Sequence, residues 1–202
     1  MAIALDSSGN YKHLVYVMAK RTDCIQQIQR IAITIPQCPR SHDARSPNGR
    51  LHGVAVTKAI ADVRFEVTVT LFTDAGGRVY QRKLSFTGDR MSAGQHDSIL
   101  DREKREGSSS PGYAEAISRV TLPRAFDPFR QILVGDDGTV WLRERNQAGH
   151  AVWLYLDQTG TPSGRAILPL RARLMVASRG QLWGLQEDQE GVESIVRWRV
   201  TR

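Results

Sequence analysis

The chain has 202 residues, a net charge of +7 and a hydrophobic content of 41%. It is long enough to bury a sizeable core, and no stretch approaches the roughly 18 apolar residues that a membrane-spanning helix needs. Only 5 of its 28 basic residues are lysine, and the arginines are scattered along the whole sequence. Nucleic-acid surfaces usually cluster their basic residues to follow the phosphates, so we expect neither a nucleic-acid partner nor a membrane span.

The N-terminal part is predicted to contain two strands followed by a loop. Tyr11–Lys20 and Ile25–Ile35 are rich in Val, Ile and Tyr, which favour strands. Residues 37–50 contain prolines, serines and a glycine, which predict a loop. The opening residues, Met1–Asp6, lack both the basic segment and the long apolar segment of a secretion signal. Either the protein is cytoplasmic or the chain lacks its original N-terminus.

Two cysteines, Cys24 and Cys38, are 14 positions apart. They could form a disulfide across adjacent strands if their Cα atoms lay within about 7 Å. Two cysteines make no disulfide framework, and neither a CxxC motif nor a Cys/His cluster indicates a metal. We therefore expect free, buried thiols.

Three further strands are predicted at Arg50–Lys58, Phe65–Phe72 and Arg78–Phe86. The last two form a hairpin around the turn Asp74–Gly77. Apolar and polar residues alternate along Phe65–Phe72, which is typical of a half-buried strand.

Residues 88–128 interrupt this pattern and are predicted to form a polar helical and loop insertion. The charged run His96–Glu106 predicts a short solvated helix, and Tyr113–Val120 predicts a second helical turn. The Ser/Gly/Pro stretch Gly107–Gly112 predicts a flexible loop. We expect the insertion to be the least regular and most mobile region, cut first by proteases near Ser108–Pro111. Long excursions of this kind often carry binding function.

The C-terminal part repeats itself with a period of 42 residues. Val134, Gly138, Trp141 and Gly149 recur at this offset as Val176, Gly180, Trp183 and Gly191. A second match, at an offset of 83 residues or about two periods, relates Val69, Leu71, Phe72, Asp74 and Gly77 to Val152, Leu154, Tyr155, Asp157 and Gly160. A period of roughly 40–45 residues that contains several short strands is the signature of a β-propeller blade.

Each of the two repeats is predicted to be a set of strands separated by glycine-containing turns. The first has four strands, at Gln131–Gly135, Thr139–Arg145, His150–Asp157 and Arg165–Pro169. The last has three, at Arg173–Ser178, Gln181–Glu187 and Glu193–Val200. Both faces of His150–Asp157 are apolar, which a strand requires only when it is covered on both sides. Blades stacked face to face supply that cover, and the final strand is expected to have one more polar face.

Several segments carry a family resemblance: Pro128-Phe129, Ile132–Arg143, Trp153–Asp157 with Gly160, and Leu182–Gly184 running into Val192–Val200. On these segments, the chain from about Arg78 to Arg202 resembles the bacterial six-bladed β-propeller proteins of the NHL-repeat and TolB-like kind. The resemblance implies an all-β fold: a β-propeller-like arc of about three to four four-stranded antiparallel blades over residues 1–202, interrupted by the insertion at 88–128. Most such relatives are exported, which implies a periplasmic or extracellular location for a full-length relative.

Six blades of this length would need about 250 residues, so we expect the chain to be an incomplete copy of the ring. A genuine four-bladed ring is one alternative. The other is an arc that closes by self-association through its exposed blade edge, since open sheet edges invite pairing.

No catalytic, cofactor-binding or metal-binding residue is predicted. The five histidines share no metal-binding spacing and fall in separate elements: His13, His42, His52, His96 and His150. Asp136-Asp137-Gly138 lacks the alternating acidic positions of a calcium loop, and turn chemistry explains it. Ser108–Ser110 has no neighbouring base or nucleophile-elbow motif. The four tryptophans could stack on a sugar or peptide, but their places in the repeat favour packing between blades for most of them: Trp141, Trp153, Trp183 and Trp198.

Two functions follow from this pattern. We expect a non-enzymatic binding or interaction module of β-propeller type, without a cofactor, whose loops hold a protein, peptide or glycan. The alternative is a metal-dependent hydrolase or lactonase-like enzyme whose site lies partly in missing blades. Such an enzyme would need acidic, Asn or His residues at the inner ends of several blades. The first strands of the two repeats are instead apolar, at Ile132–Val134 and Leu174–Val176, which favours binding.

Overall fold

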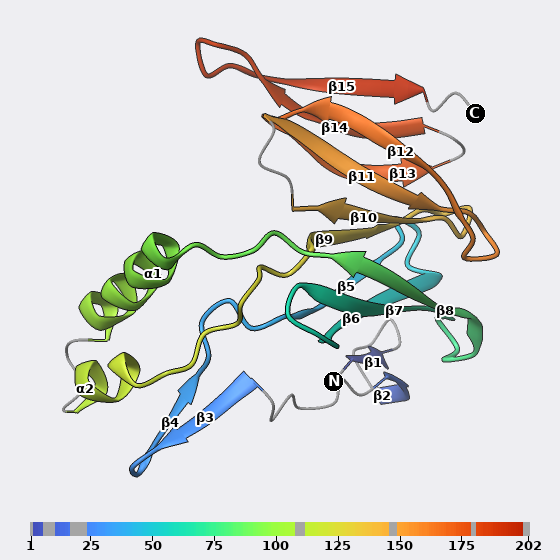
Figure 1. Cartoon of the computed structure of the whole chain (residues 1–202). Coiled ribbons are helices and arrows are strands. Elements are labelled where there is room, and N and C mark those ends of the chain that lie inside the picture. The colour runs from blue at the N-terminus through green and yellow to red at the C-terminus, as the bar shows by residue number, and fades with distance from the viewer. Residues whose placement is uncertain are drawn as a thin grey trace.

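The structure is a computed structural model that describes residues 2–5, 11–16, 24–107, 112–145, 149–178 and 181–199, with side chains from residue 24 onward. The chain is mostly β, with two short helices (Figure 1). From Cys24 onward the strands form four antiparallel sheets of two to four strands. Upstream of them, β1 (Ala2–Leu5) pairs with β2 (Tyr11–Tyr16).

The segment that follows is a hairpin of two short strands. β3 (Ile25–Ile28) pairs antiparallel with β4 (Ile31–Thr34). The prediction of one strand over Ile25–Ile35 is therefore wrong, because the chain reverses at Gln29, whose φ is 55°. The strand predicted at Tyr11–Lys20 is described as far as Tyr16, and the rest of it lies outside the described residues.

The Cys24–Cys38 pair forms a disulfide, with 5.7 Å between the Cα atoms, so the expectation of free thiols is wrong. The hairpin explains the pairing because it returns the chain to its starting point, where the Ile35 amide donates to the Cys24 carbonyl at 2.8 Å. Closing a loop of this length stabilises a fold by about 3 kcal/mol, mainly by restricting the unfolded chain.

The first four-stranded sheet has the order β5-β6-β7-β8. Its strands are β5 (Ser41–Arg45), β6 (Leu51–Ala59), β7 (Arg64–Thr73) and β8 (Arg78–Thr87). The last three confirm the sequence prediction, but β5 lies inside the segment predicted to be a loop. Its sequence is polar, yet it pairs with β6 along its whole length, and Ala44 packs against the core. Tertiary pairing therefore overrides weak strand propensity here.

The insertion at 88–128 contains the two helices, as predicted. α1 (Ala93–Glu106) begins at a capping box in which the Ser92 and Gln95 side chains bond reciprocally to each other's backbone amides. α2 (Tyr113–Ser118) follows. α2 packs on β4 and α1 packs on α2, and all three contribute to a small apolar cluster that includes Ile33, Ile99 and Ile117. The protease site predicted at Ser108–Pro111 lies outside the described residues.

The repeat region forms two more sheets and confirms the prediction of a four-stranded and a three-stranded set. The second sheet has β9 (Phe129–Val134), β10 (Val140–Glu144), β11 (His150–Leu156) and β12 (Pro162–Pro169). The third has β13 (Ala172–Ser178), β14 (Gln181–Glu187) and β15 (Glu193–Arg199). Gly138 adopts a φ of 84° and Gly191 a φ of 85°, which explains why the repeat keeps glycine in its turns.

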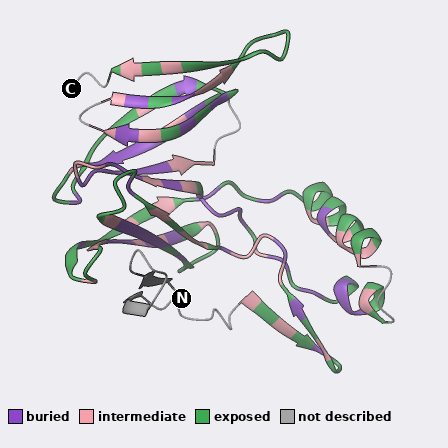
Figure 2. Cartoon of the chain, turned by 180° about the vertical axis from the view of Figure 1, so that it is seen from behind, coloured by how far each residue is buried: buried purple, intermediate pink, exposed green. Residues whose placement is uncertain are grey.

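These three sheets stack face to face, so that β11 is buried on both sides as predicted (Figures 1 and 2). Leu154 and Leu156 pack toward the first sheet, whereas Trp153 and Tyr155 pack toward the third. The first strands of the sheets lie side by side, with β9 between β5 and β13. Within the described residues the strands do not close into a ring.

The offset of 83 residues relates β7 to β11, which are the third strands of neighbouring sheets. The two matched segments are therefore one sheet apart, and the interpretation of the offset as about two periods is wrong, because the helical insertion lengthens the interval between the two sheets.

The outer face of the third sheet is uncovered in the described part of the chain, where Trp183 is 37% and Ile195 76% exposed. Trp141 and Trp153 are buried as predicted, and Trp198 packs against the same cluster. Trp183 instead lies beneath the Arg197 guanidinium, 5.4 Å from the ring centre. The prediction that most of the tryptophans pack between sheets therefore holds, and Trp183 is the exception.

Candidate functional site

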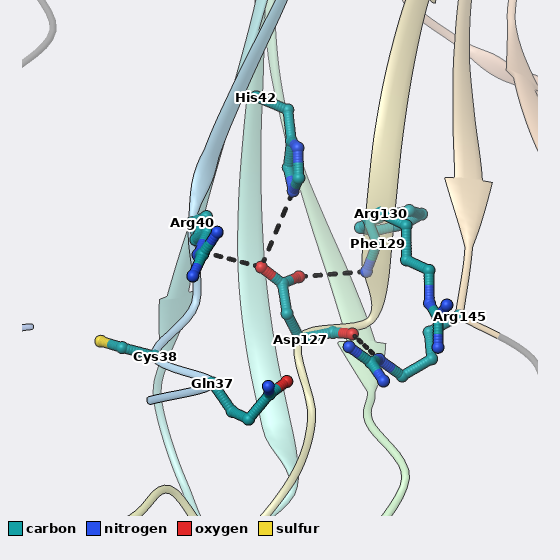
Figure 3. Close-up of a pocket in the computed structure, with 8 residues that line it drawn as sticks. All are labelled: Gln37, Cys38, Arg40, His42, Asp127, Phe129, Arg130 and Arg145. Carbon is teal, nitrogen blue, oxygen red and sulfur yellow. Dashed lines mark hydrogen bonds and ion pairs between the residues drawn. The ribbon is translucent and has the colours of Figure 1, made fainter. Parts of the chain in front are cut away.

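A pocket of about 460 Å³ lies where β5 and β9 begin and β10 ends (Figure 3). It is lined by Gln37, Cys38, Arg40, His42, Asp127, Phe129, Arg130 and Arg145. The residues come from segments almost 90 positions apart in the sequence, which meet because the first and second sheets stack with their first strands adjacent.

Asp127 is the buried anchor of this pocket, with 6% of its surface exposed. Its Oδ2 accepts a hydrogen bond from the Arg40 amide at 2.8 Å. Its Oδ1 accepts from the Phe129 amide at 3.0 Å and from the Thr57 hydroxyl at 3.4 Å. One carboxylate therefore joins the starts of β5 and β9 to β6, and its acceptor capacity is largely used by these bonds.

His42 points toward the same carboxylate, with 3.9 Å between His42 Nε2 and Asp127 Oδ2. This separation is too long for a hydrogen bond, and the buried Nε2 atom has no hydrogen-bond partner in the described part of the chain. Burial and, to a smaller extent, the Arg40 charge lower the pKa of His42 below its ordinary value of 6.5, although Asp127 and Asp43 oppose the shift. The imidazole is therefore neutral at pH 7.

Arg145 is the most firmly held of the three arginines. Its amide donates to the Pro128 carbonyl at 2.7 Å, and its Nε donates to the Asp127 carbonyl at 3.2 Å. Its guanidinium lies 4.5 Å above the Phe126 ring, within range of a cation–π contact. Burial and the nearby Arg130 lower the pKa of Arg145, but the side chain stays charged at physiological pH.

The lining of the pocket carries a surplus of positive charge. Arg40, Arg130 and Arg145 supply three cations, and Asp127 is the only carboxylate among the described lining residues. Such a site attracts anionic groups, which guanidinium forks bind through charge-assisted hydrogen bonds. Because Cys38 is oxidised and Asp127 is engaged, these lining residues offer no nucleophile paired with a base.

A second and larger cleft, of about 750 Å³, lies at the opposite ends of the same first strands. It is lined by Asn48, Arg50, Asp136, Asp137 and Ser178. Asp137 Oδ1 accepts from the Thr139 hydroxyl at 2.8 Å, and Asp136 Oδ1 accepts from the Asn48 amide at 2.9 Å. Both carboxylates thus serve turns, in agreement with the turn interpretation of Asp136-Asp137-Gly138.

The histidines lie in separate places. His52 is buried on β6, with Nε2 3.5 Å from Asp43 Oδ2. His96 is half-buried on α1, and His150 is exposed at the start of β11. The side chain of His13 and the residues Ser108–Ser110 lie outside the described residues. Among the residues that the structure describes, no three His, Cys, Asp or Glu side chains gather as metal ligands.

Sequence reasoning did not identify the pocket residues. Arg40 and His42 were assigned to a loop, whereas His42 lies in a strand whose start helps to form the pocket. One signal was present: Asp127 precedes Phe129 by two residues, the spacing at which an aspartate accepts a bond from the chain entering a strand. No sequence pattern connects either segment with Arg145.

No model of a known protein family matches the chain, and no curated protein is significantly similar to it. In the part of the chain that the structure describes, neither helix has the length and apolar character needed to cross a membrane.

Proposed function

We propose that the protein is a non-enzymatic binding module of the β-propeller type and that its ligand binds in the pocket around Asp127. The 42-residue repeat and the adjacent first strands of three stacked sheets support the propeller class. The resemblance to NHL-repeat and TolB-like propellers points in the same direction. On this proposal the sheets are blades and the helical insertion lies between two of them.

The position of the pocket is the observation that carries the proposal. It lies where two neighbouring first strands begin, so rigid sheets hold its lining side chains in place. The carboxylate of Asp127 accepts hydrogen bonds from within the protein. The arginine side chains that line the pocket have N–H donors that can bind a ligand. Because its oxygens are engaged, Asp127 is poorly placed to act as a general base or metal ligand, whereas guanidinium donors suit the binding of a ligand.

The ligand is proposed to be part of a peptide, protein or glycan, since the pocket volume suits one side chain or sugar unit. A structural disulfide is typical of proteins in oxidising compartments, which supports a periplasmic or extracellular location. Self-association through an exposed blade edge is a separate proposal.

A ligand screen by thermal shift tests the proposal. The full chain is screened with short peptides, oligosaccharides and small anions, and each hit is repeated with Arg130→Gln and with Arg50→Gln in the opposite cleft. Hits that stabilise the wild type and Arg50→Gln but not Arg130→Gln support binding in this pocket. Hits that Arg130→Gln leaves unchanged, or turnover of a hit by the purified chain, would contradict it.

A further inference from the structure

We infer that the group bound in the pocket is an oxyanion, such as a sulfate, phosphate or carboxylate, and that His42 takes up a proton when the oxyanion binds. This inference rests on the proposed binding function and names the chemistry of its ligand. Its two parts depend on different residues and are tested separately.

The first part rests on arginines without carboxylate partners. Elsewhere on the surface, ion pairs hold several of the guanidinium groups: Arg124 with Asp62 at 2.7 Å, Arg119 with Glu115 at 2.7 Å, and Arg165 with Glu144 at 2.8 Å. In the described part of the chain, neither the Arg40 nor the Arg130 side chain has such a partner, although both line the pocket. The lining thus has three cations and one engaged carboxylate, and Asp89 beside Arg145 offsets only part of this surplus.

A second observation also supports the oxyanion part of the inference: contacts within the protein hold Arg145 in place. Its backbone and Nε bonds, together with the Phe126 ring, hold the guanidinium at the pocket wall. Its Nη groups donate to no other described residue, so they are available to a ligand. A preorganised guanidinium loses less side-chain entropy when it binds an oxyanion.

His42 supplies the proton-linked component. Its Nε2 atom is buried without a hydrogen-bond partner and faces Asp127 from the strand next to β9. The charged groups around it are Arg40 and Asp43 on its own segment, Asp127 before β9, Arg130 on β9 and Arg145 after β10. On β6 its paired residue is Ala55, which has no charge.

In the free pocket, burial and Arg40 keep His42 neutral because they outweigh the nearby carboxylates. A bound oxyanion neutralises the surrounding arginines and adds a negative charge, so the pKa of His42 rises in the complex. By linkage, a group whose pKa rises on binding makes binding tighter as the pH falls, by at most tenfold per pH unit for one proton.

Sulfate is the probe for both parts, since its charge stays at −2 between pH 5 and pH 8. The full chain is titrated calorimetrically with sulfate at pH 5.5, 6.5 and 7.5, in two buffers with different ionisation enthalpies. We expect sulfate to bind more tightly at pH 5.5 than at pH 7.5, with proton uptake from the buffer. Dimethyl sulfone, a neutral molecule of the same shape, should not bind.

Matched variants separate the contributions. Arg130→Gln should weaken sulfate binding about tenfold because it removes a charged donor, whereas Arg50→Gln should leave binding unchanged. His42→Asn should still bind sulfate, but with an affinity that does not depend on pH. His42→Gln repeats this test in case the first variant folds poorly. Parallel titrations with phosphate and acetate at pH 7.5 show whether a tetrahedral or a planar oxyanion is preferred.

The outcomes distinguish this inference from the proposed function. A neutral peptide or glycan that needs Arg130, with no binding of any of the three oxyanions, would overturn the oxyanion inference and leave the binding function intact. Sulfate binding with equal affinity at all three pH values would overturn the role of His42 alone. Failure of every ligand to bind in the pocket would overturn both.

Discussion

The two ends of the first strands use similar polar residues in different ways. At both ends an aspartate crosses from the second sheet to the first: Asp127 accepts from the Arg40 amide at 2.8 Å, and Asp136 accepts from the Asn48 amide at 2.9 Å. At the Asp136 end the polar groups serve tight turns. At the Asp127 end three arginines surround a carboxylate that is already engaged.

This difference distinguishes the polar groups that connect the sheets from the polar groups that are available to a ligand. Each end needs one buried or half-buried acceptor to connect neighbouring sheets, and each has it. Only the end at Asp127 keeps an excess of cationic donors after these bonds are made, so we place ligand binding there. The excess, and not the cavity volume, distinguishes the ends, because the cleft at Asp136 is the larger one.

The largest expected effect is the loss of the Asp127 carboxylate. Asp127→Ala removes the acceptor for two backbone amides and a hydroxyl, and should lower the free energy of unfolding by about 2–4 kcal/mol. Asp136→Ala, its counterpart at the other end, should cost less than about 1 kcal/mol because its bond is solvent-accessible. Urea denaturation of both variants measures the difference, and equal costs would refute the asymmetry between the ends.

Reduction of the disulfide should have the next largest effect. Cys24–Cys38 closes a loop that ends beside the pocket, and opening it should lower the free energy of unfolding by about 2–3 kcal/mol. Urea denaturation with and without dithiothreitol measures this. The double variant Cys24→Ala/Cys38→Ala is the control: its stability should not respond to the reductant, and a wild type that is equally unresponsive would contradict the prediction.

The sequence predicted those parts of the fold that local patterns determine. The strands of the two C-terminal sheets and the double cover of β11 follow from repeated glycines, tryptophans and alternating apolar residues. β5 was missed because its side chains are polar and its pairing with β6 decides its conformation. The disulfide was missed because the reversal at Gln29, which brings the cysteines together, has no glycine to mark it.

The pocket could not be predicted because it exists only after the sheets stack. Arg40, Asp127 and Arg145 lie in three segments with ordinary sequences, and their charges look scattered along the chain. Stacking of the sheets brings these residues together at one end of the first strands. The distribution of arginines along the sequence therefore does not predict the local surplus of positive charge. The prediction that no nucleic-acid partner exists stays untested.

Acid titration should change the stability of the protein in two pH ranges, one set by His42 in the pocket and one set by Asp157 in the turn after β11. Burial lowers the pKa of His42 below 6.5, so the unfolded chain takes up the proton first and stability falls as the pH drops below that value. Hydrogen bonds from Thr159 and Thr161 lower the pKa of Asp157, in the turn after β11, from 3.8 to about 2, so its contribution is lost only between those values.

Single variants assign these two ranges. Chemical denaturation at a series of pH values should show that His42→Asn reduces the loss of stability below pH 6.5, where buried His52 contributes as well. Asp157→Asn should change the profile only below about pH 4. A change in the profile of His42→Asn confined to the range below pH 4 would contradict the assignment of a buried, neutral imidazole.

Mapping of sulfate binding by two-dimensional 1H–15N NMR tests the central claim most directly. With increasing sulfate, the account predicts saturable shifts of the backbone amides of Arg40, His42, Arg130 and Arg145, and none at Asn48, Asp136 and Ser178 in the opposite cleft. Shifts centred on the opposite cleft, or none that saturate at either end, would contradict the conclusion that this end of the first strands binds the ligand.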